Sequence, residues 1–262
     1  MKIALVQSNL IWEDIQTNLS KFDILLSGLS KNTEIVILPE MFSTGFTMNV
    51  DNLSKPIGQR AFQWLQQKAS ATGKVVVGSI LTEENIKYYN RLYWMRPDGG
   101  FDYYDKRHLF HQSGEDKIMT AGDRRVVVSH KGIKFMLQIC YDLRFPVAVK
   151  NNYDKETDTY DYDVIVYIAN WPEVRKQAYL SLLKARAIEN QAYVIWVNRV
   201  GEDGQKIHHC GDTQLLDAYG NTVAQSPLNE ESLLDIDIDI EALYQFRNQF
   251  KVGVDWDAHR IM

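Results

Sequence analysis

Cysteine is scarce in this 262-residue sequence: Cys140 and Cys210 are the only two, too few for a disulfide framework. A reducing compartment suits such a chain, so we expect a cytoplasmic protein. The N-terminus shows no signal-peptide pattern, because residues 2–7 enter a strand pattern directly. No run approaches the roughly 18 consecutive apolar residues that a membrane-spanning helix needs, so we expect no membrane partner.

An excess of positive charge is also missing. The formal net charge is −5, and this balance argues against a nucleic-acid partner or an anionic membrane surface. The sequence contains neither a glycine-rich phosphate loop nor a dinucleotide-binding fingerprint. We therefore expect no cofactor.

Hydrophobic residues make up 45% of the chain, and their spacing alternates between the periods of strands and helices. This pattern predicts the α/β class, and the absence of repeats and linkers favours one domain over residues 1–262. The polar, acidic stretch 151–163 is interpreted as an exposed insertion. Helical spacing is expected at residues 18–30, 58–72 and 176–191. Strand patterns are expected at residues 2–7, 34–38, 74–79, 88–95, 125–130, 133–139, 164–169, 193–200, 212–216, 223–224 and 234–240, and a further short strand is expected just before Lys106.

Cys140 stands at a change of pattern that suggests a special position. An apolar strand, residues 133–139, leads into it, and a polar stretch and Pro146 follow it. This layout predicts that a strand delivers the cysteine to a sharp strand-to-helix turn, near a helix N-terminus. The dipole and free N–H groups there would favour a thiolate and could stabilise an oxyanion. The alternative is a structural cysteine that packs as a small buried hydrophobe.

Three residues with useful chemistry follow predicted strands: Glu40, Lys106 and Cys140. In open α/β sheets, sites gather where strands end. For acyl transfer, Cys140 would be the nucleophile and Glu40 the base that accepts its proton. Lys106 would be a fixed cation that faces the charge developing on the carbonyl oxygen. Taken singly, each of the two charged residues is more simply a turn or surface residue.

Three segments around these residues resemble the signature segments of the nitrilase, or carbon–nitrogen hydrolase, superfamily. They are residues 38–42 (LPEMF), 104–110 (YDKRHLF) and 140–146 (CYDLRFP). Their order and spacing also fit, because Lys106 lies 66 residues after Glu40 and Cys140 lies 34 residues after Lys106. Residues 185–190 (ARAIEN) resemble a fourth segment. The resemblance spans nearly the whole chain.

The resemblance implies a Glu40–Lys106–Cys140 triad in a four-layer α-β-β-α sandwich that usually pairs into homodimers. It places the second glutamate of the superfamily on Glu115, which would position the lysine and the substrate amide. Asp116 is adjacent, so the local alignment leaves that assignment open. The backbone N–H of Tyr141 would complete the oxyanion site with Lys106.

Two further segments resemble the ω-amidase branch of the superfamily: residues 44–46 (TGF) and 169–172 (ANWP). The enzymes of this branch hydrolyse the side-chain amide of 2-oxoglutaramate and related ω-amides. The resemblance therefore implies substrate binding by Asn170 and Trp171, with Arg175 close behind them. Arg175 could hold the substrate carboxylate with its planar fork. The plainer interpretations are core packing for Trp171 and a surface charge for Arg175.

Other patterns are weaker. On a strand, His208 and Cys210 would share a face and offer two ligands at most, so we expect no metal. Arg144, Arg186 and Glu189 are interpreted as buried ion pairs or dimer contacts. The rival functions are another carbon–nitrogen hydrolase, such as a carbamoylase, aliphatic amidase or nitrilase, and a catalytically silent dimeric binding module.

Overall fold

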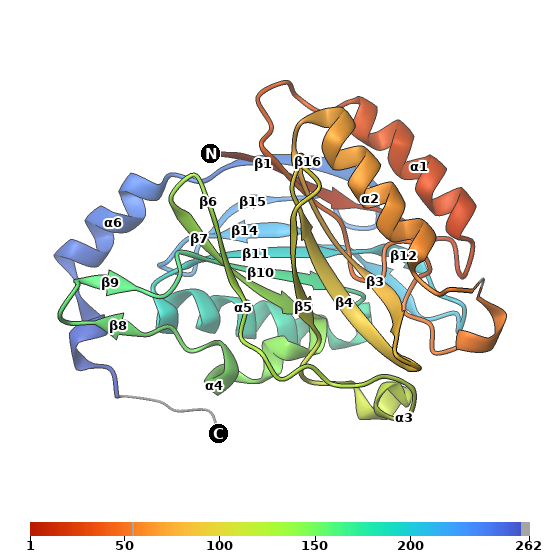
Figure 1. The fold of residues 1–262 in the computed structure, drawn as a ribbon. Coiled ribbons are helices and arrows are strands. Elements are labelled where there is room, and N and C mark those ends of the chain that lie inside the picture. Colours follow the sequence, from red (N-terminus) through yellow and green to blue (C-terminus); the bar gives the residue numbers. More distant parts are fainter. Residues whose placement is uncertain (54, 258–262) are drawn as a thin grey trace.

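Two six-stranded sheets pack face to face between helical layers in the computed structural model, which describes residues 1–53 and 55–257 (Figure 1). Helices α1 and α2 cover the outer face of the first sheet, and α5 covers that of the second. The strand order is β16-β1-β2-β3-β4-β5 in the first sheet and β15-β14-β11-β10-β7-β6 in the second. This arrangement is the predicted α-β-β-α sandwich.

The observed elements follow the predicted ones closely along most of the chain. The large helices are α1 (Ile15–Ser27), α2 (Gln59–Thr72) and α5 (Lys176–Asn190). The first sheet contains β1 (Lys2–Gln7), β2 (Ile35–Ile37), β3 (Val75–Glu84), β4 (Lys87–Met95), β5 (Phe101–Asp105) and β16 (Ser232–Asp237). The second contains β6 (Val127–His130), β7 (Ile133–Ile139), β10 (Val164–Ala169), β11 (Tyr193–Asn198), β14 (Gln214–Leu216) and β15 (Thr222–Gln225). The smaller elements are α3 (Glu115–Ile118), α4 (Pro146–Val149), α6 (Ile240–Gln249), β8 (Tyr153–Asp154), β9 (Thr159–Tyr160), β12 (Val200–Glu202) and β13 (His208–Cys210).

Strand β1 shows why the inner strands are apolar on both sides. Ile3 and Leu5 point into the core between the sheets, whereas Ala4 and Val6 point into the core under α1 and α2. Successive side chains of a strand alternate between faces, so a strand with two covered faces must be apolar throughout. The continuous apolar run of residues 2–7 therefore follows from the two buried faces.

The predicted strand at residues 234–240 was placed too far along the chain. Strand β16 ends at Asp237, and α6 begins at Ile240. The side chain of Asp239 accepts a hydrogen bond from the backbone N–H of Ala242, 3.1 Å away, and so caps the helix. An aspartate at this position favours a helix start, and it ends the alternating pattern earlier than the hydrophobic residues alone suggest.

The acidic stretch 151–163 is exposed only in part. Strands β8 and β9 form a small hairpin with an exposed tip, but Asn151 and Asp163 at its base are buried. Asp163 accepts a hydrogen bond from Arg247 of α6, 2.7 Å away, and this ion pair offsets the cost of burying its charge. The prediction of a plain surface insertion was therefore wrong for the base of the hairpin.

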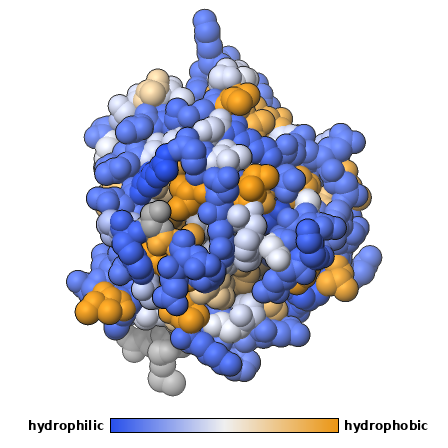
Figure 2. Space-filling view, turned by 90° about the vertical axis from the view of Figure 1, so that its right-hand side faces the viewer, coloured by the Kyte–Doolittle hydropathy of each residue, from blue (hydrophilic) through white to orange (hydrophobic). Residues whose placement is uncertain are grey.

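The surface is mixed in polarity. The face shown in Figure 2 is mainly hydrophilic, with hydrophobic residues gathered in small separate groups. Within residues 1–53 and 55–257, no helix is both long enough and apolar enough to cross a membrane.

Candidate active site

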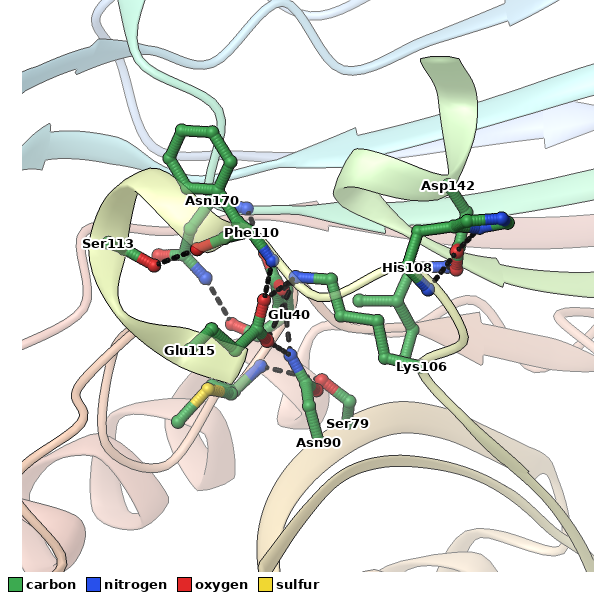
Figure 3. Close-up of polar contacts among 12 residues, drawn as sticks. Glu40, Ser79, Asn90, Lys106, His108, Phe110, Ser113, Glu115, Asp142 and Asn170 are labelled. Atoms are coloured by element: carbon green, nitrogen blue, oxygen red, sulfur yellow. Dashed lines mark hydrogen bonds and ion pairs between the residues drawn. The ribbon is translucent and has the colours of Figure 1, made fainter. Parts of the chain in front are cut away.

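The structure brings the three strand-end residues of the predicted triad to one place. Glu40 and Lys106 follow β2 and β5 of the first sheet, and Cys140 follows β7 of the second. The Nζ atom of Lys106 lies 3.0 Å from Oε1 of Glu40 (Figure 3), and Lys106 and Cys140 line one cavity. The exposed fractions are 0% for Glu40, 1% for Lys106 and 8% for Cys140. Ends of strands from both sheets therefore build this site.

Glu115 is the second carboxylate at the lysine. It is the first residue of α3, and both of its carboxylate oxygens lie 3.0 Å from Nζ of Lys106. One of them also accepts the backbone N–H of Phe110 at 2.6 Å. Asp116 instead pairs with the exposed His111 at 2.8 Å. Of the two adjacent acidic residues, Glu115 is the one at the site.

Cys140 lies on a sharp turn that other residues hold in place. Its φ is +45°, in the left-handed region that costs a non-glycine residue about 1–3 kcal/mol. A short 3₁₀ helix, Cys140–Arg144, starts there, and the buried carboxylate of Asp142 supports it. Asp142 accepts the N–H of Ile139 at 3.0 Å and the hydroxyl of Tyr104 at 2.8 Å. The predicted strand-to-helix turn is present, and these bonds stabilise its strained conformation.

The surroundings of Cys140 favour its neutral thiol over the thiolate that a helix N-terminus would favour. Burial raises the pKa of Cys140 well above its ordinary value, and the negative charge of Glu40 raises it further. Lys106 and the backbone N–H of Asn170 act in the opposite direction without cancelling this rise. The 3₁₀ helix is only five residues long, so its dipole is small. The resting cysteine is therefore a neutral thiol that needs a base.

Burial acts on the charged partners as well. Burial disfavours the charge of Lys106, but the carboxylates of Glu115 and Glu40 outweigh it and raise the pKa of the lysine. Burial also raises the pKa of Glu115, and Glu40 adds to this rise while Lys106 opposes it. Lys106 thus stays a cation at neutral pH, between two carboxylates that compete for one positive charge.

Asn170 lies at the end of β10 and contacts Glu40 twice. Its backbone N–H donates to Oε2 of Glu40 at 2.7 Å, and its side-chain amide donates to the backbone oxygen of Glu40 at 2.5 Å. The side chain predicted to bind substrate therefore orients Glu40, although Asn170 also lines the cavity. Asn198 holds the next residue, because its side chain bonds both the N–H and the carbonyl of Trp171, at 2.9 and 3.0 Å.

The cavity beside Cys140 has a volume of about 330 Å³ and two arginines in its wall. The guanidinium of Arg175 lies over the ring of Phe110, 5.2 Å from its centre. The guanidinium of Arg144 lies over the ring of Trp171, 4.9 Å from its centre. Among the described residues neither arginine forms an ion pair with an acidic side chain. The cavity therefore presents two cations beside aromatic surfaces.

The interpretation of Arg144 as a buried ion-pair residue was wrong. Arg186 and Glu189 do form such a pair, at 2.8 Å, but Arg144 is exposed and lines the cavity. Arg144 is the last residue of the short 3₁₀ helix that begins at Cys140, and its side chain lines the same cavity as Cys140. Its closeness to Cys140 in the chain was the available signal, but that closeness does not determine the direction of the side chain.

The residues 208–210 have separate partners. A ring nitrogen of His208 lies 2.9 Å from the side-chain oxygen of Asn229, and one of His209 lies 3.0 Å from the carbonyl of Ile207. Burial lowers the pKa of His209 to about 4. The described residues contain no group of three or more His, Cys, Asp or Glu side chains arranged to hold a metal ion.

Asn90 of β4 is a site residue that the sequence reasoning missed. Its side-chain nitrogen lies 2.8 Å from Oε1 of Glu40 and 3.4 Å from Oε1 of Glu115 (Figure 3). Asn90 shares a strand face with the apolar residues Leu92 and Trp94, and this period-two spacing was the available signal. The pattern predicts the burial of such a residue but does not identify its partners.

Comparison with known proteins agrees with this geometry. The sequence model of the family described as carbon–nitrogen hydrolase matches residues 2–248. An omega-amidase YafV of Yersinia enterocolitica is 39% identical, and the match covers 100% of this chain and 99% of that protein. A 2-oxoglutaramate amidase of Bacillus subtilis is 29% identical, with 97% and 96% covered.

A solved structure shows the same fold. The crystal structure of XC1258 from Xanthomonas campestris, described as a CN-hydrolase superfamily protein with an arsenic adduct in the active site, superposes with a TM-score of 0.95. It is 36% identical, and the match covers 100% of this chain and 99% of that one. Sequence and fold therefore point to the same family.

Proposed function

Because this chain belongs to the carbon–nitrogen hydrolase family, we propose that it hydrolyses the ω-amide of small dicarboxylic or keto acids, of which 2-oxoglutaramate is the type. The products are the free acid and ammonia. The observation that carries this proposal is the pair of cavity arginines without an acidic partner among the described residues, beside Cys140 and Lys106. The names of the Yersinia and Bacillus relatives support the same substrate class.

In the acylation half of the proposed reaction, Cys140 attacks the amide carbon while Glu40 accepts the thiol proton. The raised pKa of the thiol makes this proton transfer necessary. Negative charge develops on the carbonyl oxygen, where Lys106 and the backbone N–H of Tyr141 stabilise it. Tyr141 lies in the first turn of the 3₁₀ helix, where N–H groups have no acceptor within the helix. Glu40 then gives the proton to the leaving nitrogen, and ammonia departs from the thioester.

In the second half, Glu40 takes a proton from a water molecule, and the resulting hydroxide attacks the thioester carbon. The carbon–sulfur bond breaks, the acid leaves, and the thiol recovers its proton. Glu115 is assigned to hold Lys106 in place, because both its oxygens contact Nζ. None of these steps calls for a metal or an organic cofactor.

The substrate carboxylate is assigned to Arg175, with Arg144 as a second cation near it. An arginine can hold a carboxylate through two parallel hydrogen bonds. Burial and the neighbouring charge of Arg144 lower the pKa of Arg175, so an anion between the two guanidinium groups relieves their repulsion. Trp171, which lies under Arg144, would form an apolar wall for the short carbon chain.

Replacing Arg175 with alanine should raise KM mainly for acidic ω-amides. The loss corresponds to one charged hydrogen bond, ~1.5–3 kcal/mol, or roughly 10- to 100-fold in kcat/KM. Arg144→Ala should act in the same direction. The measurement is kcat/KM for 2-oxoglutaramate and for butyramide in each variant, with the exposed Arg60→Ala of α2 as control. A preference for the acidic substrate that survives in both variants would move the carboxylate site elsewhere.

The thiol of Cys140 should become more acidic when Glu40 is replaced with glutamine. The carboxylate of Glu40 raises the pKa of this thiol, so its removal lowers that pKa, whereas Lys106→Met should raise it. The measurement is thiolate absorbance against pH in a Cys210→Ala background, which removes the other cysteine. An unchanged or higher thiol pKa in Glu40→Gln would contradict the assigned coupling.

Two kinds of rival are separable by simple assays. A carbamoylase, an aliphatic amidase or a nitrilase would release ammonia preferentially from a carbamoyl amino acid, butyramide or butyronitrile. A silent dimeric binding module would release none. Ammonia release across this panel tests the proposed function, and no release from any ω-amide would reject it. Intact mass after incubation with an ω-amide also tests for a covalent adduct.

The remaining assignments are that residues 1–262 form one domain, that the protein acts in the cytoplasm, and that it is a homodimer. The core between the sheets, which includes Leu5, Leu137 and Leu243 from distant parts of the chain, supports the first. Two cysteines, both free and buried, support a reducing compartment. Exposed apolar residues, such as Ile188 of α5 and Phe250 directly after α6, support a subunit contact.

A further inference from the structure

Asn90 occupies a position between two carboxylates for which the triad gives no reason. Its side chain is fully buried in the middle of β4. Its backbone carbonyl accepts a hydrogen bond from the backbone N–H of Lys106 at 3.0 Å, so the two residues are neighbours. Its side-chain nitrogen contacts Glu40 at 2.8 Å and Glu115 at 3.4 Å. Its side-chain oxygen has no hydrogen-bond partner among the described residues.

The side-chain amide of Asn90 acts as a hydrogen-bond donor only, because its nitrogen has partners and its oxygen has none among the described residues. Leaving a buried carbonyl oxygen without a partner costs free energy, so the contacts on the nitrogen side must compensate. Both acceptors there are carboxylate oxygens. A donor favours the ionised form of the carboxylate that it contacts, and the shorter contact, to Glu40, favours it more.

The electrostatic setting makes this choice important. Glu40 and Glu115 are buried, share the single cation Lys106, and repel each other when both are ionised. Two such carboxylates tend to hold one proton between them. If Glu40 held that proton, it could not accept the one that Cys140 must lose.

We propose that Asn90 is a positioning residue of the hydrolytic site, whose amide keeps Glu40 as a carboxylate and directs any proton shared by the pair to Glu115. Asn90 does not touch the reacting atoms but acts through Glu40. The inference rests on the proposed role of Glu40 as the base, and it goes beyond the triad by naming what keeps that base available.

The test is the pH dependence of Cys140 alkylation by iodoacetamide, followed by peptide mass. In this reaction the cysteine sulfur bonds the carbon, iodide leaves, and Glu40 accepts the proton. The rate should therefore fall at acidic pH where Glu40 becomes protonated. In Asn90→Leu this fall should move to higher pH by about one unit, equivalent to a tenfold change in proton affinity. On the acidic side of this fall, the kcat for an ω-amide should be about tenfold below that of the wild type, with KM little changed.

Two further variants make the result decisive. Asn90→Asp is nearly isosteric and adds a third carboxylate, so the fall in alkylation rate should move to still higher pH. This variant also tests the inference if Asn90→Leu does not fold. Asn151→Leu is the matched control, because Asn151 is a buried amide whose partners among the described residues are Asn190 and Tyr162. Asn151→Leu should lower stability, but the alkylation rate should still fall at the same acidic pH as in the wild type.

A fall at the wild-type position in both Asn90 variants would overturn the inference and assign Asn90 a purely structural role. The alkylation reaction requires no substrate amide, so it is separable from the proposed function. The wild type could release no ammonia from ω-amides while the pH at which the alkylation rate falls still shifts in the Asn90 variants. In that case the substrate assignment fails and the inference about Asn90 stands.

Discussion

Cys140→Ala is expected to abolish ammonia release from ω-amides while the protein stays folded. Without the sulfur no thioester can form, and no other described residue in the cavity supplies a nucleophile held against Glu40 and Lys106. Removing one small side-chain atom costs little beside total stability. Cys140→Ser should also be nearly inactive, because Glu40 would have to remove a proton from a much less acidic hydroxyl. Initial rates and thermal unfolding of both variants check this.

Cys210→Ala provides the matched control. Cys210 is also free and fully buried, but its sulfur lies beside the hydroxyl of Tyr179, 3.6 Å away and outside the cavity. This variant should keep wild-type rates. Normal turnover in Cys140→Ala, or a loss of activity that appears only in Cys210→Ala, would exclude the assigned nucleophile.

The second large effect is expected for Lys106→Met, which should lower kcat by about 10²-fold or more, the scale of one oxyanion donor. The substitution keeps the length of the side chain and removes its charge. It also leaves Glu40 and Glu115 buried without their cation, and breaking a buried ion pair in this way costs about 3–5 kcal/mol of stability. The carboxylates would then take up protons more readily, so this destabilisation should be largest at high pH and smaller as pH falls.

Lys74→Met is the control for losing a buried lysine. Lys74 is 9% exposed, and its ammonium donates to the backbone oxygens of Lys31 and Thr33 rather than to carboxylates. It should lose stability without loss of kcat. If kcat in Lys106→Met fell no further than in Lys74→Met, the lysine would have no role in catalysis beyond folding.

The fold and the centre of the site were predictable for a common reason. Apolar runs such as residues 2–7 and 164–169 determine strands with two buried faces, and polar residues directly after strands mark the edge where sites form. Glu40, Lys106 and Cys140 all occupy such positions. The order and spacing of their segments then separated them from ordinary turn residues.

Orientation within the site was not predictable in the same way. Spacing places Arg144 close to Cys140 in the chain, but the direction of its side chain depends on the 3₁₀ turn that Asp142 supports. The periodicity of β4 predicts that Asn90 is buried, while its contacts depend on how the strands β2 and β4 and helix α3 meet. Both are tertiary facts, and no local pattern contains them.

The protonation state of Cys140 was not predictable from the sequence, because it depends on competing effects of burial and neighbouring charges. Burial and Glu40 raise the pKa of the thiol, Lys106 and the backbone N–H of Asn170 lower it, and the first two effects are larger. The sequence names the charges near the cysteine but not the depth at which it is buried. The neutral thiol in turn explains why the site needs Glu40 as a base.

The most direct test of the central claim compares kcat/KM of the wild-type enzyme for 2-oxoglutaramate with that for butyramide, measured by ammonia release. The two arginines of the cavity predict a preference for the acidic ω-amide of roughly tenfold or more, the value of a charged hydrogen bond. Equal values, or a preference for butyramide, would contradict the assignment to ω-amides of dicarboxylic acids.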